Sequence, residues 1–147
     1  MMKLLCKHTY KAVLISSILS FLFLLYSPIC TGQGFKIVKE KNGVEISENN
    51  RKILYYQYLP KSLKGKYEKA GYIHPLYNLS GSVITEDFPA DHPHHHGVFW
   101  AWHQILVNDK KIADGWTSDN LSFEPLQIET KKKKSFAEIK SMLLWKS

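Results

Sequence analysis

The sequence predicts an all-β protein, an antiparallel β-sandwich. Apolar and polar residues alternate along most of residues 33–147, as expected of strands with one buried face. Turn signals separate these short runs at regular intervals, which is typical of sandwiches and barrels. No segment of this region has convincing helical periodicity, and no internal repeat is present. A hydrophobic content of 44% and a charged content of 22% fit a globular domain.

Residues 35–59 predict a three-stranded meander. Phe35 and Ile37 mark the first strand, and Asn42-Gly43 is the strongest short signal for a β-hairpin. The turn sequence ENNR then leads into KILYYQYL, which is rich in strand-forming residues. The polar stretch 61–70 predicts a loop.

The middle of the chain predicts three strands, and a long loop joins the last two. Residues 71–79 form the first, which Pro75 restricts to an edge, a bulge or an end. A turn, a short strand over 83–85 and the loop EDFPADHP follow. Residues 97–107 are apolar on both faces, which predicts a central, buried strand with Trp100 and Trp102 in the core.

The last third predicts two further strands. NDKK and ADGW indicate turns, residues 121–130 a strand, Lys131–Lys134 a turn, and residues 135–146 a closing strand. Because the sequence stops directly after this amphipathic strand, we expect residues 33–147 to be the N-terminal part of a longer, here incomplete, sandwich domain.

Residues 1–32 predict a signal peptide. Three lysines precede the apolar run AVLISSILSFLFLLY, and the small residues at 30–32 suggest cleavage before Gln33. We therefore expect export to the periplasm or the exterior. An uncleaved membrane anchor is the second alternative, and a lipid-anchored Cys30 the third.

Composition excludes several functions. Both cysteines, Cys6 and Cys30, lie in the leader, so the exported chain has no disulfide and no thiol catalysis. The run Lys131–Lys134 is interpreted as a solvated turn rather than a polyanion patch. No basic face with interleaved aromatic residues is evident, so no nucleic-acid partner is expected.

Five of the seven histidines lie within residues 92–103. In an extended segment His92, His94 and His96 would share one face, and three imidazoles with one open position make a catalytic metal site. Asp91 could be a further ligand or orient a histidine. The possible cofactor is a divalent transition metal ion. By the same alternation His95 would point away from the other two.

A second interpretation needs no metal. Histidine is the usual general acid or base at neutral pH. The catalytic candidates are then His74, Asp91, His92 and His94, with Trp116 stacking on a sugar ring and His103 as a further substrate-binding residue. A purely structural role for the histidines is the third alternative.

Residues 72–116, with the steps HPLY and DHPHHHGVFWAW, are similar to the signature region of the PmoA-like family, a domain of unknown function labelled "methane oxygenase PmoA". His74, Asp91, His92, His94 and His95 match its motif, whereas many relatives have arginine at position 96. The resemblance implies an exported protein, a supersandwich like that of sugar mutarotases and a role with carbohydrate. Methane oxidation is not carried over, because true subunits of that enzyme cross the membrane several times and this chain has one apolar segment.

These observations predict an exported protein that acts on or binds carbohydrate through its histidine-rich segment. The alternatives are a metal-dependent oxidase, as the family label suggests, and a non-catalytic carbohydrate-binding module. The expected partner is a small molecule or a glycan, and membrane contact is expected only through an uncleaved leader.

Overall fold

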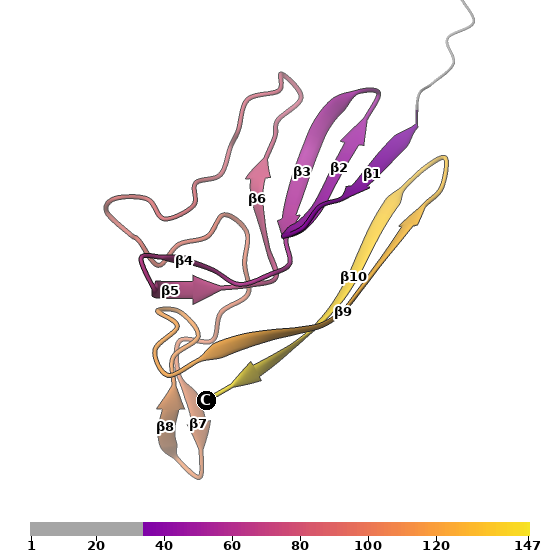
Figure 1. Ribbon diagram of the computed structural model, residues 1–147. Helices are drawn as coiled ribbons and strands as arrows, with labels where there is room; N and C mark the ends of the chain where they lie inside the picture. Colours follow the sequence, from indigo (N-terminus) through magenta and orange to yellow (C-terminus); the bar gives the residue numbers. More distant parts are fainter. Residues whose placement is uncertain (1–33) are drawn as a thin grey trace, which may run out of the picture. The chain divides into compact units, whose positions relative to one another are not determined.

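The computed structural model describes residues 34–147, so the predicted signal peptide lies outside the described residues. All regular structure in residues 34–147 is β, which confirms the predicted class (Figure 1). No helix in this range has the length and hydropathy needed to cross a bilayer. The strands are β1 Phe35–Lys39, β2 Gly43–Glu48, β3 Arg51–Gln57, β4 Lys61–Leu63, β5 Lys66–Lys69, β6 Tyr72–Leu76, β7 Ile105–Val107, β8 Lys110–Ala113, β9 Ser122–Lys132 and β10 Ala137–Lys146.

The largest sheet has the order β1-β2-β3-β6, and each neighbouring pair is antiparallel. The predicted meander is therefore confirmed. The first hairpin closes where the Glu40 N–H donates to the Gly43 carbonyl at 2.8 Å. Asn49 and Asn50 form the second turn with φ of 51° and 63°, which asparagine tolerates better than most residues.

The hairpin β9–β10 forms a second layer beside this sheet (Figure 1). The Tyr56 hydroxyl on β3 is hydrogen-bonded to the Ser141 hydroxyl on β10, and Leu143 packs against Gly71. Two packed β layers are the arrangement from which sandwiches are built. The buried apolar residues are Val44, Ile46, Ala70, Tyr72, Ala113 and Phe123.

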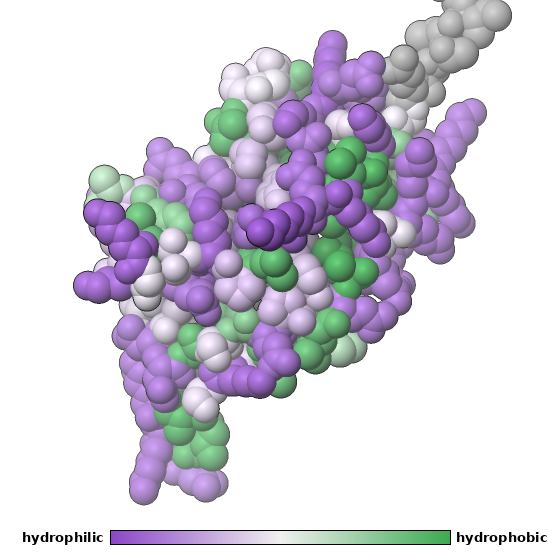
Figure 2. Space-filling view, viewed as in Figure 1, coloured by the Kyte–Doolittle hydropathy of each residue, from purple (hydrophilic) through white to green (hydrophobic). Residues whose placement is uncertain are grey.

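The central strand predicted over residues 97–107 is wrong. Only Ile105–Val107 is a strand, and it pairs with β8 in a separate two-stranded sheet. Trp100 and Trp102 are 78% and 65% exposed. The segment is apolar on both faces, but strands do not flank it on both sides. Figure 2 shows hydrophobic surface on the β7–β8 hairpin at the bottom of the view, where Leu106 and Val107 are exposed.

Pro75 lies on β6, which is an edge strand of its sheet, one of the positions that the sequence allowed for this proline. Beyond its partner β3, β6 makes only an isolated bridge from Ile73 to Val98. The His74–Pro75 peptide bond is cis.

Two shorter predictions are also wrong. Residues 61–70 are not a loop: β4 and β5 form a hairpin whose turn, Lys64-Gly65, has positive φ at both residues. Residues 83–85 form no strand, because only Val83 makes a bridge. The turns predicted at NDKK and at Lys131–Lys134 are confirmed, at Asn108-Asp109 and directly after Lys132, although Lys110 and Lys111 belong to β8 and Lys131 and Lys132 to β9.

Candidate functional site

Residues 86–97 form a closed loop rather than an extended segment. Its base is a bridge between Asp87 and His96, and the Gly97 N–H donates to the Glu86 carbonyl at 2.7 Å. At its tip the His95 N–H donates to the His92 carbonyl at 2.9 Å, which makes a tight turn. The premise that alternate histidines share one face is therefore wrong.

The loop tip gathers three imidazoles against one indole, and we call His92, His94, His95 and Trp116 the histidine cluster. His92 and His95 stack with ring centroids 4.9 Å apart and an interplanar angle of 15°. His94 meets His95 edge to face at 4.6 Å. Trp116, 39% exposed, lies 5.4 Å from His95 and 5.9 Å from His94, centroid to centroid. His95, predicted to point away, is thus at the centre.

The cluster includes groups suited to proton transfer. Asp91 Oδ2 lies 3.0 Å from His92 Nδ1, and this hydrogen bond is the main cause that lowers the pKa of Asp91. Burial lowers the pKa of His94, and the neighbouring His95 and His92 lower it further. His94 is therefore neutral at neutral pH and has a ring nitrogen able to accept a proton.

His96 has a different environment from its neighbours. It is 0% exposed, its Nδ1 is 3.0 Å from Asp87 Oδ1, and its ring meets Phe88 edge to face. Asp87 Oδ2 accepts hydrogen bonds from Lys61 Nζ at 2.6 Å and from the Tyr72 hydroxyl at 3.0 Å. We call Asp87, His96, Lys61 and Tyr72 the Asp87 network.

Asp87 stays ionised in this network. Burial alone would raise its pKa, but the hydrogen bonds from His96 and Lys61 outweigh burial and lower it. An ionised carboxylate only accepts hydrogen bonds, so His96 Nδ1 carries a proton and donates it to Asp87. The Nε2 of His96 is buried and has no hydrogen-bond partner among the described residues.

A buried aspartate holds the turn that presents Trp116. Asp114 Oδ1 accepts the backbone N–H of Trp116 at 2.9 Å, while Oδ2 accepts Lys111 Nζ at 2.9 Å. Burial alone would raise the pKa of Asp114, but these bonds and one from the Thr117 N–H lower it to about 2. His103 Nδ1 lies 3.2 Å from the same Oδ2.

Lys69 supports this turn from beneath. Its side chain is 1% exposed, and its Nζ donates to the Gly115 carbonyl. The ammonium lies over the rings of Phe99 and Phe123, at 5.3 Å and 5.0 Å from their centroids. Burial lowers the pKa of Lys69 to about 8, and the charge of Asp114 opposes this shift.

The structure therefore brings some of the predicted site residues together and leaves others apart. Asp91, His92, His94 and Trp116 come together. His103 lies apart from the cluster but shares Asp114 with the Trp116 turn. His74 lies on β6, and its Nδ1 is hydrogen-bonded to the Thr85 hydroxyl at 3.0 Å. Sequence reasoning missed Asp87, Asp114 and Lys69. In the sequence, Asp87 and Asp114 are simply acidic residues in predicted loops. Nothing distinguishes Lys69 from the other lysines of the polar stretch 61–70.

The predicted metal ligands do not fit a metal ion in this arrangement. His96 is turned to Asp87, away from the stacked pair His92 and His95. His95 cannot take the place of His96, because imidazole lone pairs lie in the ring plane and the parallel rings of His92 and His95 cannot both direct a nitrogen at one ion. Within residues 34–147, no three His, Cys, Asp or Glu side chains are arranged to hold a metal.

Comparison with known proteins gives a family but no activity. No curated protein and no solved structure matches the chain. Residues 43–147, from the start of β2 to the last residue and more than half of the sequence, match a family described as "Family of unknown function (DUF6807)". The matched range includes the histidine cluster and the Asp87 network. The chain therefore belongs to this family of unknown function.

Proposed function

We propose that this protein is exported and binds carbohydrate at the histidine cluster, where His94 exchanges a proton with the bound sugar. The observation that carries the proposal is the packing of Trp116, partly exposed, against His94 and His95 at the tip of one loop. An indole face stacks on the apolar face of a sugar ring, and imidazoles hydrogen-bond or exchange protons with its hydroxyls. The resemblance to the PmoA-like family supports the same class of ligand.

The environments of the histidines assign their roles. His94 is the general base, because its pKa is lowered and it is neutral at neutral pH. Asp91 orients His92 by accepting its Nδ1–H. Asp114 fixes the backbone that carries Trp116, so the stacking surface is held in place before the ligand arrives.

The geometry favours this proposal over a metal-dependent oxidase, because His96, one of the three predicted ligands, is held by Asp87 at the base of the loop instead of lying with His92 and His94 at its tip. The choice between an enzyme and a binding module depends on His94. In an enzyme, His94→Gln retains sugar binding and loses turnover. In a binding module, no turnover exists to be lost.

The test measures binding of gluco-, manno-, galacto- and xylo-oligosaccharides to the purified chain by calorimetry. Trp116→Ala should weaken binding by tenfold or more, about 1.4 kcal/mol. Trp100→Ala is the matched control, because Trp100 is also exposed but lies outside the cluster. Equal loss in both variants, or undiminished binding in Trp116→Ala, would refute the site.

A further inference from the structure

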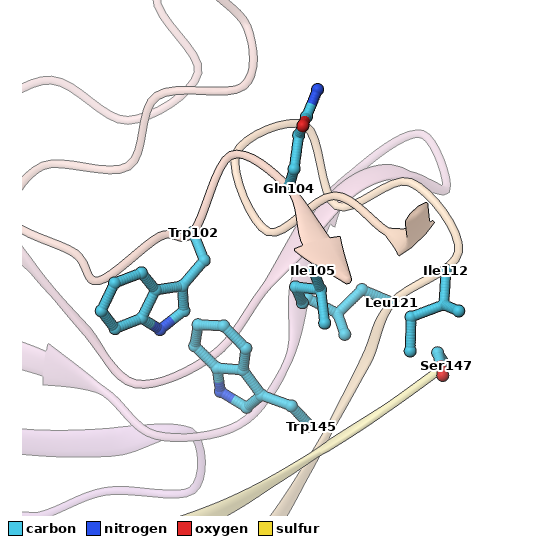
Figure 3. A pocket seen from close by; sticks show the side chains of 7 residues that line it. All are labelled: Trp102, Gln104, Ile105, Ile112, Leu121, Trp145 and Ser147. Atoms are coloured by element: carbon cyan, nitrogen blue, oxygen red, sulfur yellow. The ribbon is translucent and has the colours of Figure 1, made fainter. Parts of the chain in front are cut away.

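A pair of tryptophans lines a pocket outside the histidine cluster. Trp102 and Trp145 border a pocket of about 330 Å³, and Ile105, Ile112 and Leu121 form the rest of its apolar wall (Figure 3). Trp102 comes from the segment before β7 and Trp145 from β10. In this view the two indoles lie side by side, with their edges toward each other, and Gln104 points away.

The two indoles are held differently. Trp145 is anchored, because its ring meets the buried Phe123 edge to face at 5.5 Å. Trp102 is 65% exposed, so it leaves most of its apolar area in water. Burial would stabilise that area by roughly 25 cal/mol per Å². One exposed apolar residue is ordinary, but an exposed indole that borders a concave pocket is typical of a binding surface.

The pocket adjoins the turn that carries Trp116 of the histidine cluster. The Gly115 N–H donates to the Trp102 carbonyl at 2.8 Å. A Cβ at Gly115 would lie 2.9 Å from the Trp102 carbonyl oxygen and 3.3 Å from the Trp145 ring. Gly115, the residue before Trp116, thus packs directly against the backbone of Trp102 and the ring of Trp145, so the turn that carries Trp116 adjoins the pocket.

The lining limits the chemistry of the occupant. None of the residues that line the pocket is a charged side chain. Its volume lies at the small end of the range of ligand sites, which runs from about 300 to 1,000 Å³. Aromatic walls and a neutral lining fit one uncharged sugar ring, which stacks on an indole and receives a hydrogen bond from an indole N–H.

We infer that the Trp102–Trp145 pocket is a second sugar subsite, continuous with the histidine cluster, so the ligand is a neutral oligosaccharide rather than a single sugar. This inference rests on the proposed function. One sugar unit lies against Trp116 and the histidines, and a following unit lies between Trp102 and Trp145.

The experiment compares chain lengths. Calorimetry is run with cello-, manno- and xylo-oligosaccharides of increasing length, starting from the monosaccharide. In the unmodified protein we expect affinity to rise about tenfold or more beyond one unit. Trp102→Ala should lose that gain and keep the affinity for the monosaccharide. Trp100→Ala, the matched exposed tryptophan outside the pocket, should keep both.

The outcomes separate the two proposals. Monosaccharide binding with no gain from length, or a gain that persists in Trp102→Ala, overturns the subsite and leaves the proposed function standing. Absence of binding at every length overturns both. Sedimentation velocity is measured in parallel. If Trp102→Ala turns a dimer into a monomer and leaves oligosaccharide affinity unchanged, the pocket is a contact between copies and the inference is overturned.

Discussion

Nδ1 of His96 lies 3.0 Å from Oδ1 of Asp87, and both side chains are almost completely withdrawn from water. This pairing separates the third of three consecutive histidines from the other two. His94 and His95 lie against Trp116, whereas His96 closes the base of the loop from inside. The loop is therefore anchored by one histidine and presents the others.

Removing the Asp87 carboxylate should destabilise the whole domain. Asp87→Ala leaves the buried N–H of His96 and the hydroxyl of Tyr72 without their acceptor. Loss of one partner from a buried charged group costs about 3 kcal/mol. Urea unfolding should show a free energy of unfolding lower by that order. Glu86→Gln, the exposed neighbouring acid, should change it by less than about 0.5 kcal/mol.

The buried ammonium of Lys69 should make stability rise with pH. Burial lowers its pKa from 10.5 to about 8 in the folded protein, so between these values the unfolded chain binds more protons. The free energy of unfolding then increases with pH by roughly 1 kcal/mol per unit. The measurement is urea unfolding from about pH 8 to about pH 9.5, below the ordinary range of tyrosine ionisation.

Two variants check the source of that slope. Lys69→Met should flatten it, and Lys66→Met, an exposed lysine on the same strand, should preserve it. A slope that survives in Lys69→Met would assign the pH dependence to another group.

His94 should titrate below the ordinary histidine value of 6.5. Burial lowers the pKa of His94 most, and the charges of His95 and His92 add to this effect. His95→Gln removes one of these charges, so the pKa of His94 should rise in that variant but stay below 6.5. The Cε1–H resonance of His94, followed by NMR against pH, reports both values. A midpoint at or above 6.5 in the unmodified protein would contradict the environment described for His94.

The sequence predicted the fold better than it predicted the site. Alternation and asparagine turns are local signals, and they located the meander and the closing hairpin correctly. The central strand predicted over residues 97–107 was wrong, because two apolar faces do not reveal whether neighbouring strands exist to bury them. The predicted arrangement of the histidines was wrong in part for the same reason. Alternation paired His94 with His96, but the turn at His92–His95 rotates them apart, and that turn depends on the distant contact between Asp87 and His96.

Gly97, the glycine that ends the site loop, should not tolerate a side chain. Its φ is 59°, and a Cβ there would lie 2.2 Å from the Ile73 carbonyl oxygen and 3.0 Å from the His74 Cβ. Gly97→Ala therefore combines backbone strain with a collision against β6, and only a shift of the loop relieves the collision. We expect a loss of more than about 2 kcal/mol in the free energy of unfolding, since strain at positive φ alone costs about 1–2 kcal/mol.

Gly81→Ala separates the two effects. Gly81 also has positive φ, 85°, but nothing lies within 4 Å of a Cβ placed there, so this variant has the strain without the collision. Urea unfolding of both variants should rank Gly97→Ala as clearly the more destabilised. The NMR resonances of His94 and His95 should move in Gly97→Ala and stay in place in Gly81→Ala, because Gly97 directly follows the histidines and fixes the base of their loop through its bond to Glu86. Equal losses of stability in the two variants would mean that Gly97 does not pack closely against β6, and that the base of the loop is held by Asp87 and His96 alone.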